Sequence, residues 1–126
     1  MFKRFILVTR VLATIALLGR TGGAHAASQT WDNGSSNYSW NTSSTNWGGT
    51  VWTAGNDAVF GATGVGTITV SGTQTIGTGS DTPLTFNTAG YTLANGTLAL
   101  PGAGNTSTLA VNANATIASQ LSGAGT

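Results

Sequence analysis

The feature that most restricts the fold of this chain is the small number of large apolar side chains in each of its recurring short segments. From Gly66 onward, stretches rich in strand-forming residues begin six to eleven positions apart, with Gly, Asn or Pro in most of the gaps. They are TITV (67–70), TQTI (73–76), LTF (84–86), YTL (91–93), TLAL (97–100), TLAV (108–111) and ATIA (115–118). The pattern predicts an array of short strands joined by tight corners.

Each predicted strand offers only two apolar side chains to a core. Side chains alternate across a strand, so Ile68 and Val70 share one face. The pairs Leu84–Phe86, Leu98–Leu100 and Leu109–Val111 follow the same rule. At ~25 cal/mol per Å² of buried apolar area, two side chains per strand are too few for a deep sandwich core.

Stacking removes this shortage of apolar area. If about three short strands form one coil and coils lie ~4.8 Å apart, each coil buries its thin apolar stripe against the next. The sequence therefore predicts an all-β fold, a right-handed parallel β-solenoid of about four coils with roughly 20 to 25 residues each. An antiparallel β-sandwich is the alternative, because seven short strands would also suit it.

The first 26 residues have the pattern of a secretory signal peptide. Three basic residues precede the apolar run VLATIALLG (11–19), and Ala24 and Ala26 place small residues where a signal peptidase reads. We expect cleavage between Ala26 and Ala27. The apolar run is far shorter than the ~20 residues that cross a bilayer, so no membrane-spanning segment is expected in the mature chain.

Removal of this leader changes the charge balance and excludes several functions. All four Lys and Arg residues and the one histidine lie within it, so residues 27–126 carry three Asp and no cation. Nucleic-acid binding requires cations that neutralise phosphates, so it is excluded. The chain has no cysteine, which excludes disulfides and thiolate metal sites. Gly, Ser, Thr and Asn make up 57 of these 100 residues.

The stretch TWDNGSSNYSWNTSSTNWGGTVW (30–52) contains all four tryptophans of the chain. Trp31, Trp40, Trp47 and Trp52 could stack on sugar rings and so form a carbohydrate-binding platform. Alternatively, they fill and cover the first coil of the solenoid, each burying roughly 150 to 250 Å². We favour the cap, because the rest of the core is thin.

Catalytic and metal sites are poorly supported by the sequence. Asp32, Asp57 and Asp81 each lie beside turn residues, where a capping role is the common one. Without a histidine the mature chain has no nucleophile–histidine triad, and without a cation it has nothing basic to stabilise developing charge. We expect no catalysis, no cofactor and no metal site; a lone GTGSD (77–81) is not a calcium-binding repeat.

The order of these motifs resembles the start of bacterial proteins that carry autotransporter-associated β-strand repeats. The likeness rests on the spaced tryptophans and GNDAVF between residues 31 and 60, on GTITVSGTQTI (66–76), on LTFNTAGYTLANGTLAL (84–100) and on ATIASQLSGAG (115–125). It implies a secreted β-solenoid passenger at the outer surface of a Gram-negative cell.

These observations divide the chain into a signal peptide (1–26), a Trp-rich N-terminal cap segment (27–65) and a β-strand repeat segment (66–126). The last residues, ASQLSGAGT, contain no polar cap or helix that would cover an open coil, so we interpret the repeat segment as truncated. The predicted function is that of an exported structural and adhesive passenger. Its expected partners are the export machinery and a glycan or other component of a host or cell surface.

Overall fold

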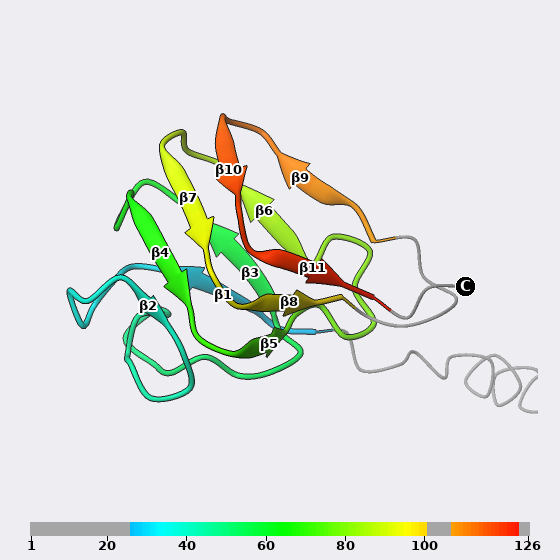
Figure 1. Ribbon diagram of the computed structural model, residues 1–126, viewed down its shortest axis with the longest axis horizontal. Helices are drawn as coiled ribbons and strands as arrows, with labels where there is room; N and C mark the ends of the chain where they lie inside the picture. The colour runs from blue at the N-terminus through cyan, green and yellow to red at the C-terminus, as the bar shows by residue number, and fades with distance from the viewer. Residues whose placement is uncertain (1–25, 101–106, 124–126) are drawn as a thin grey trace, which may run out of the picture.

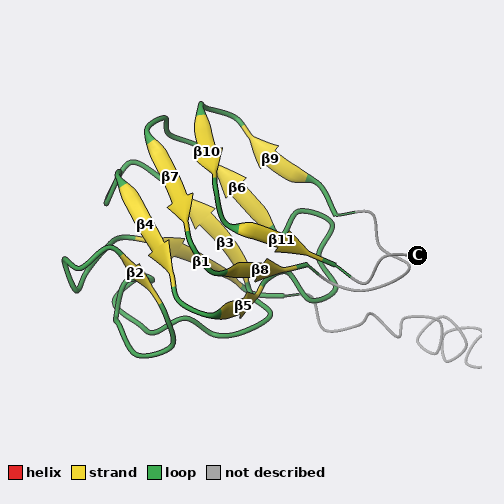
Figure 2. Cartoon of the chain, in the orientation of Figure 1, coloured by secondary structure: helices red, strands yellow, loops and turns green. Residues whose placement is uncertain are grey.

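The computed structural model describes residues 26–100 and 107–123, and within them the fold is all-β with no helix (Figures 1 and 2). The strands are β1 (Ser28–Trp31), β2 (Ser39–Trp40), β3 (Asp57–Phe60), β4 (Thr67–Val70), β5 (Thr73–Thr75), β6 (Leu84–Phe86), β7 (Tyr91–Ala94), β8 (Thr97–Ala99), β9 (Leu109–Val111), β10 (Ala115–Ile117) and β11 (Gln120–Ser122). All are short, as the spacing of turn residues in the sequence requires.

The strands form three sheets that share one winding axis. Their orders are β1-β3-β6-β9, β2-β4-β7-β10 and β5-β8-β11, and every pairing between these strands is parallel. The chain therefore passes from sheet to sheet and returns to the first one coil later, as a right-handed β-solenoid of about four turns (Figure 1). The predicted solenoid is confirmed, and the antiparallel sandwich is wrong.

The register shows how much chain each coil uses. Ala58 pairs with Leu84, 26 positions later, and Leu98 pairs with Leu121, 23 positions later. The first coil is longer, because Trp40 pairs with Val70 across 30 positions. The extra residues lie between β2 and β3, in the segment that contains Trp47 and Trp52.

Alternation decides which side chains enter the core. Ile68 and Val70 of β4 are buried while the two threonines of that strand are exposed. The buried apolar set is Trp31, Trp40, Trp47, Trp52, Ala58, Phe60, Ile68, Val70, Ile76, Leu84, Phe86, Tyr91, Leu93 and Leu98. One polar residue breaks the rule, because Gln74 lies at the inward position of β5 and its amide donates to the Ser71 carbonyl at 2.6 Å.

The corners depend on residues that accept a left-handed backbone. Gly96 has φ of 53°, and a side chain there would collide with the backbone carbonyls of Val70 and Gly72 in the coil below. Asn95 precedes it with φ of 60°, a conformation that asparagine tolerates better than most residues. This Asn-Gly corner joins β7 to β8 and sets the closeness of successive coils.

Candidate functional site

The four tryptophans form one cluster inside the first coil. Trp31, Trp40, Trp47 and Trp52 are 0%, 0%, 1% and 2% exposed. The ring centroids of Trp47 and Trp52 lie 4.5 Å apart, and those of Trp40 and Trp47 lie 4.7 Å apart. Tilted and edge-to-face contacts at this distance add to the hydrophobic stabilisation. The cluster continues into Phe60, whose centroid is 5.6 Å from that of Trp47.

The segment between β2 and β3 holds this cluster closed. Trp47 and Thr50 exchange backbone hydrogen bonds of 3.1 Å around Gly48 and Gly49, which both have positive φ, as a tight two-residue hairpin requires. Trp47 also bridges Trp31 in antiparallel fashion. The outer edge of β1 is therefore paired at its last residue, Trp31.

The side chains of Gln29 and Asp32 hydrogen-bond to the same segment. The Gln29 amide nitrogen donates to Thr50 Oγ1 and to the Val51 carbonyl, and its oxygen accepts the Thr53 backbone N–H at 2.8 Å. The Asp32 carboxylate accepts N–H groups from Gly34 at 2.9 Å and Gly49 at 3.0 Å. These bonds tie the cap segment to β1 and to the turn after it.

The burial of the rings bears directly on the carbohydrate platform. No tryptophan ring presents a face to solvent, so none can stack on a sugar in this arrangement. The Trp31 indole N–H donates to the Gly64 carbonyl at 3.0 Å. The indole nitrogens of Trp40, Trp47 and Trp52 are buried with no hydrogen-bond partner among the described residues, which suits a packed cluster better than a recognition surface.

The predicted cleavage point lies just before the first strand. Ala24 is outside the described residues. Ala26 is half-buried and Ala27 is exposed, and the Ala27 carbonyl accepts the Asp57 backbone N–H at 2.8 Å. The sheet structure thus begins directly after the position where we expect the leader to be removed.

The three carboxylates serve separate turns. Asp32 caps the turn after β1, as described above. One Asp57 oxygen accepts the Ser80 hydroxyl at 2.9 Å, and its other oxygen is buried with no partner among the described residues. Asp81 contributes its backbone carbonyl, which accepts the Thr108 N–H at 2.8 Å. No group of three or more metal-ligating side chains occurs in the described part of the chain.

A tyrosine pair occupies the corner between β3 and β4. Tyr91 is buried, and its single hydroxyl proton is shared between two carbonyl oxygens, those of Gly61 at 2.8 Å and Thr63 at 2.6 Å. Desolvation, with a smaller contribution from the nearby Tyr38 phenol, raises the pKa of Tyr91 above its ordinary value. No sequence pattern predicts that these two tyrosines lie near each other, because they are 53 positions apart along the chain.

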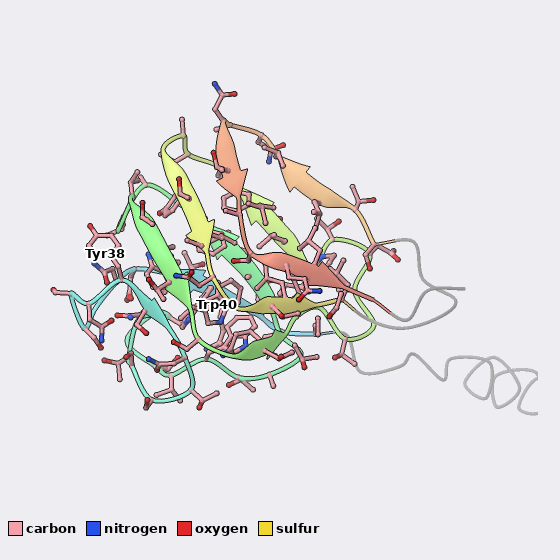
Figure 3. All side chains as sticks on the ribbon, viewed as in Figure 1. Tyr38 and Trp40 are labelled. Atoms are coloured by element: carbon pink, nitrogen blue, oxygen red, sulfur yellow. The ribbon has the colours of Figure 1, made fainter. Side chains whose placement is uncertain are left out.

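Tyr38 is the one aromatic side chain exposed in the described residues, at 37% (Figure 3). Figure 3 places it at the outer edge of the molecule, whereas Trp40, two residues later, lies in the interior. Its φ of 48° is unusual for an aromatic residue, and its hydroxyl donates to the Val65 carbonyl at 3.3 Å.

At the opposite end of the stack, no strand within residues 26–100 and 107–123 pairs with the outer side of β9, β10 or β11, which each lie at the end of their sheet order. Val111 follows Phe86 in the same register, yet Val111 is 52% exposed and Phe86 is 0% exposed. Leu121 follows Leu98 in the same way, at 43% against 0%. We name the apolar surface formed by Leu109, Val111, Ile117 and Leu121 the open end.

Comparisons with known proteins give no direct indication of function. No protein-family model, no curated protein and no solved structure matches the chain. Among the described residues, none of the secondary structure is a helix with the length and apolar character needed to span a membrane. The described residues form a stack of coils. Its first coil is filled by the tryptophan cluster, its last coil is uncovered, and its outward faces carry rows of small polar side chains.

Proposed function

We propose that this chain is an exported, non-catalytic β-solenoid that serves as a structural and adhesive surface element, in the manner of an autotransporter-like passenger. The observation that carries the proposal is the use of all four tryptophans inside the first coil. With these rings buried, contact with partners falls to the outward faces of the stacked coils. These faces present the same residue types from coil to coil.

The outward faces consist of aligned hydroxyl and amide groups. Thr67, Thr92 and Thr116 occupy one register across β4, β7 and β10. Thr73, Thr97 and Gln120 occupy another across β5, β8 and β11, and the Thr97 hydroxyl donates to the Gln120 side-chain oxygen at 3.3 Å. An extended uncharged polar face of this kind suits repeated weak contacts with a glycan or protein surface.

The absence of catalysis in this proposal is supported by what the sequence supplies. Residues 27–126 contain no histidine, lysine or arginine. Acid–base or oxyanion chemistry would have to rely on Asp32, Asp57 and Asp81 alone, and each of these serves a different turn.

Export is tested by expressing the chain from its first residue in a Gram-negative host. We expect the purified protein to have lost residues 1–26, as measured by intact mass, and to leave the cytoplasm. An Ala24→Arg/Ala26→Arg double variant should keep its leader, whereas Ala27→Ser should be processed normally. Full-length protein in the cytoplasm in all three cases would contradict the proposal.

Tryptophan fluorescence tests whether the cap or a sugar platform describes the Trp-rich segment in solution. Buried rings emit at short wavelength and are insensitive to added glycans, so we expect blue-shifted emission that does not change with cellohexaose or chitohexaose. A red-shifted spectrum that responds to either sugar would restore the carbohydrate-binding interpretation of Trp31, Trp40, Trp47 and Trp52.

A further inference from the structure

We propose that Tyr38 is a stacking site for a neutral sugar ring of a surface glycan. This site rests on the proposed function, because it gives the adhesive surface element one defined contact for its glycan partner. It is separate from the four tryptophans, whose rings are buried. The exposure of the Tyr38 ring, the strained backbone that presents it and the rigid loop beneath it point to this role.

Tyr38 is the single aromatic side chain that the described residues leave exposed, at 37%. It directly precedes β2, and Figure 3 shows it at the outer edge of the molecule, whereas Trp40 lies in the interior. The nearby Val65 is 36% exposed and has a glycine on either side. These two glycines carry no side chain that could cover the ring, so the ring and Val65 form a small accessible apolar surface.

The backbone that presents the ring is held in an unfavourable conformation. Asn33, Ser36 and Tyr38 have positive φ, and they are three of the four non-glycine residues with this conformation in the described parts of the chain. For a bulky residue such as tyrosine this is a true outlier. Neighbouring groups impose it, because the Asn33 side-chain oxygen accepts the Tyr38 N–H at 2.9 Å and the Tyr38 carbonyl accepts the Thr69 N–H at 2.8 Å. Strain maintained in this way is concentrated at functional sites, so it indicates a role for the ring.

A rigid loop lies under the ring. In the connection between β3 and β4, a Cβ on Gly66 would come within 2.8 Å of Tyr38 Cε1, so the ring lies directly against this glycine. The Tyr38 hydroxyl donates to the Val65 carbonyl at 3.3 Å. Two buried aromatic side chains, Trp31 and Tyr91, hydrogen-bond to three further carbonyls of the same loop. The ring is therefore held in place before a ligand arrives, which lowers the entropic cost of binding.

The surroundings of the ring favour a neutral sugar over a charged ligand. Residues 33–46 carry no charged side chain, and the adjacent Asp32 carboxylate already accepts two backbone N–H groups. An anionic ligand would need a basic residue, and residues 27–126 contain none. A pyranose ring has an apolar C–H face and a rim of hydroxyls, so it matches a phenol ring set among amide and hydroxyl side chains.

Tyrosine-specific NMR tests this site directly, because the chain contains only two tyrosines. The protein is expressed from its first residue with ¹³C-labelled tyrosine and titrated with cellohexaose, chitohexaose and mannohexaose. At least one of these neutral sugars should shift the Tyr38 ring signals in a saturable manner. The signals of the buried Tyr91 should not move, and hexagalacturonate, which is charged, should shift neither ring.

Matched variants separate stacking from other contributions. Tyr38→Ala should weaken binding of the responding sugar about 10-fold or more, because the stacking ring is lost. Tyr38→Phe keeps the ring and loses only the bond to Val65, so its affinity should stay within about threefold of the wild-type value. Val111→Ala shortens an exposed apolar side chain of the last coil and should leave the affinity unchanged. Circular dichroism and an unchanged Tyr91 spectrum establish that each variant is folded.

Two results would overturn the site: no saturable shift of Tyr38 with any of the three neutral sugars, or equal affinities of the wild type and Tyr38→Ala. Failure of the site is distinguishable from failure of the proposed function. A chain that is exported and adheres to cells while Tyr38 does not respond would refute the site alone. A responding Tyr38 in a chain that keeps its leader in the cytoplasm would support the site and refute export.

Discussion

The first and last coils contain the same ladder of inward residues but differ completely in how well they are covered. Trp31, Phe60, Phe86 and Val111 follow one another in register, and their exposed fractions are 0%, 0%, 0% and 52%. Inward direction is a property of the strand, whereas burial requires a neighbour on both sides along the stack. The difference teaches that each coil obtains much of its stability from the adjacent coils.

The first coil depends on its aromatic cluster for stability, so removing one ring should lower the free energy of unfolding by the largest amount. Trp40 contacts Trp47, Trp52 and Phe60, and Trp40→Ala should destabilise the protein by about 3–5 kcal/mol through lost burial and the cavity left behind. Urea unfolding followed by circular dichroism measures this loss. Trp40→Phe, which keeps a ring, should cost clearly less. Equal, small losses for both would show that the cluster does not hold this coil.

The same substitution at two levels of one ladder tests the comparison directly. Leu98→Ala should cost about 2–4 kcal/mol, because Leu98 is fully buried between Gln74 and Leu121. Leu121→Ala should cost less than about 1 kcal/mol, because its side chain is 43% exposed. Both losses are measured by urea unfolding followed by circular dichroism. Equal costs would mean that the open end is covered in solution.

Alkaline pH should loosen the corner between β3 and β4. Because the pKa of Tyr91 is raised in the folded state, the folded protein holds the phenol proton more tightly than the unfolded chain does. The resulting stability is present below the unfolded pKa of about 10 and is lost as pH rises through the higher folded value. Tyr91→Phe should cost about 1 kcal/mol at neutral pH and should flatten this alkaline decline. Thermal unfolding between pH 8 and 11 measures both effects.

The smallest expected effect is a gain in stability in the turn before β2. Ser36 is exposed and has φ of 55°, and its backbone N–H donates to the Asn33 carbonyl. Ser36→Gly keeps that bond and removes the left-handed strain, so it should stabilise the protein by about 0.5–1 kcal/mol. A lower melting temperature for this variant would show that the Ser36 side chain contributes more than its strain costs.

The sequence was sufficient for the repeat segment, because its strands obey alternation and are separated by turn residues. TITV and LTF coincide with β4 and β6, and YTL, TLAL and ATIA each overlap a strand to within one residue. It was insufficient for β2 and β11. The first has only two residues, and the second, Gln120–Ser122, has a single apolar residue and follows β10 after only two residues, so neither shows two apolar positions on one face.

The surfaces were harder to predict than the strands. Composition favoured a tryptophan cap, and the burial of all four rings agrees with that interpretation. The exposure of Val111 could not be predicted, because alternation places it inward and only the absence of a further described coil leaves it uncovered. The inward Gln74 and the hydrogen bonds of Tyr91 to the Gly61 and Thr63 carbonyls depend on corners formed by residues distant in sequence, for which a single sequence carries no signal.

The register of the ladders also has a consequence for the order of folding. Except for β5, every strand from β3 onward is paired with a strand about one full coil earlier in the chain, so each later coil forms on a surface that already exists. The tryptophan cluster lies in the first coil, on which the later coils are stacked, so it is the natural nucleus. Growth then runs in one direction, towards the C-terminus, and each added rung becomes the template for the next.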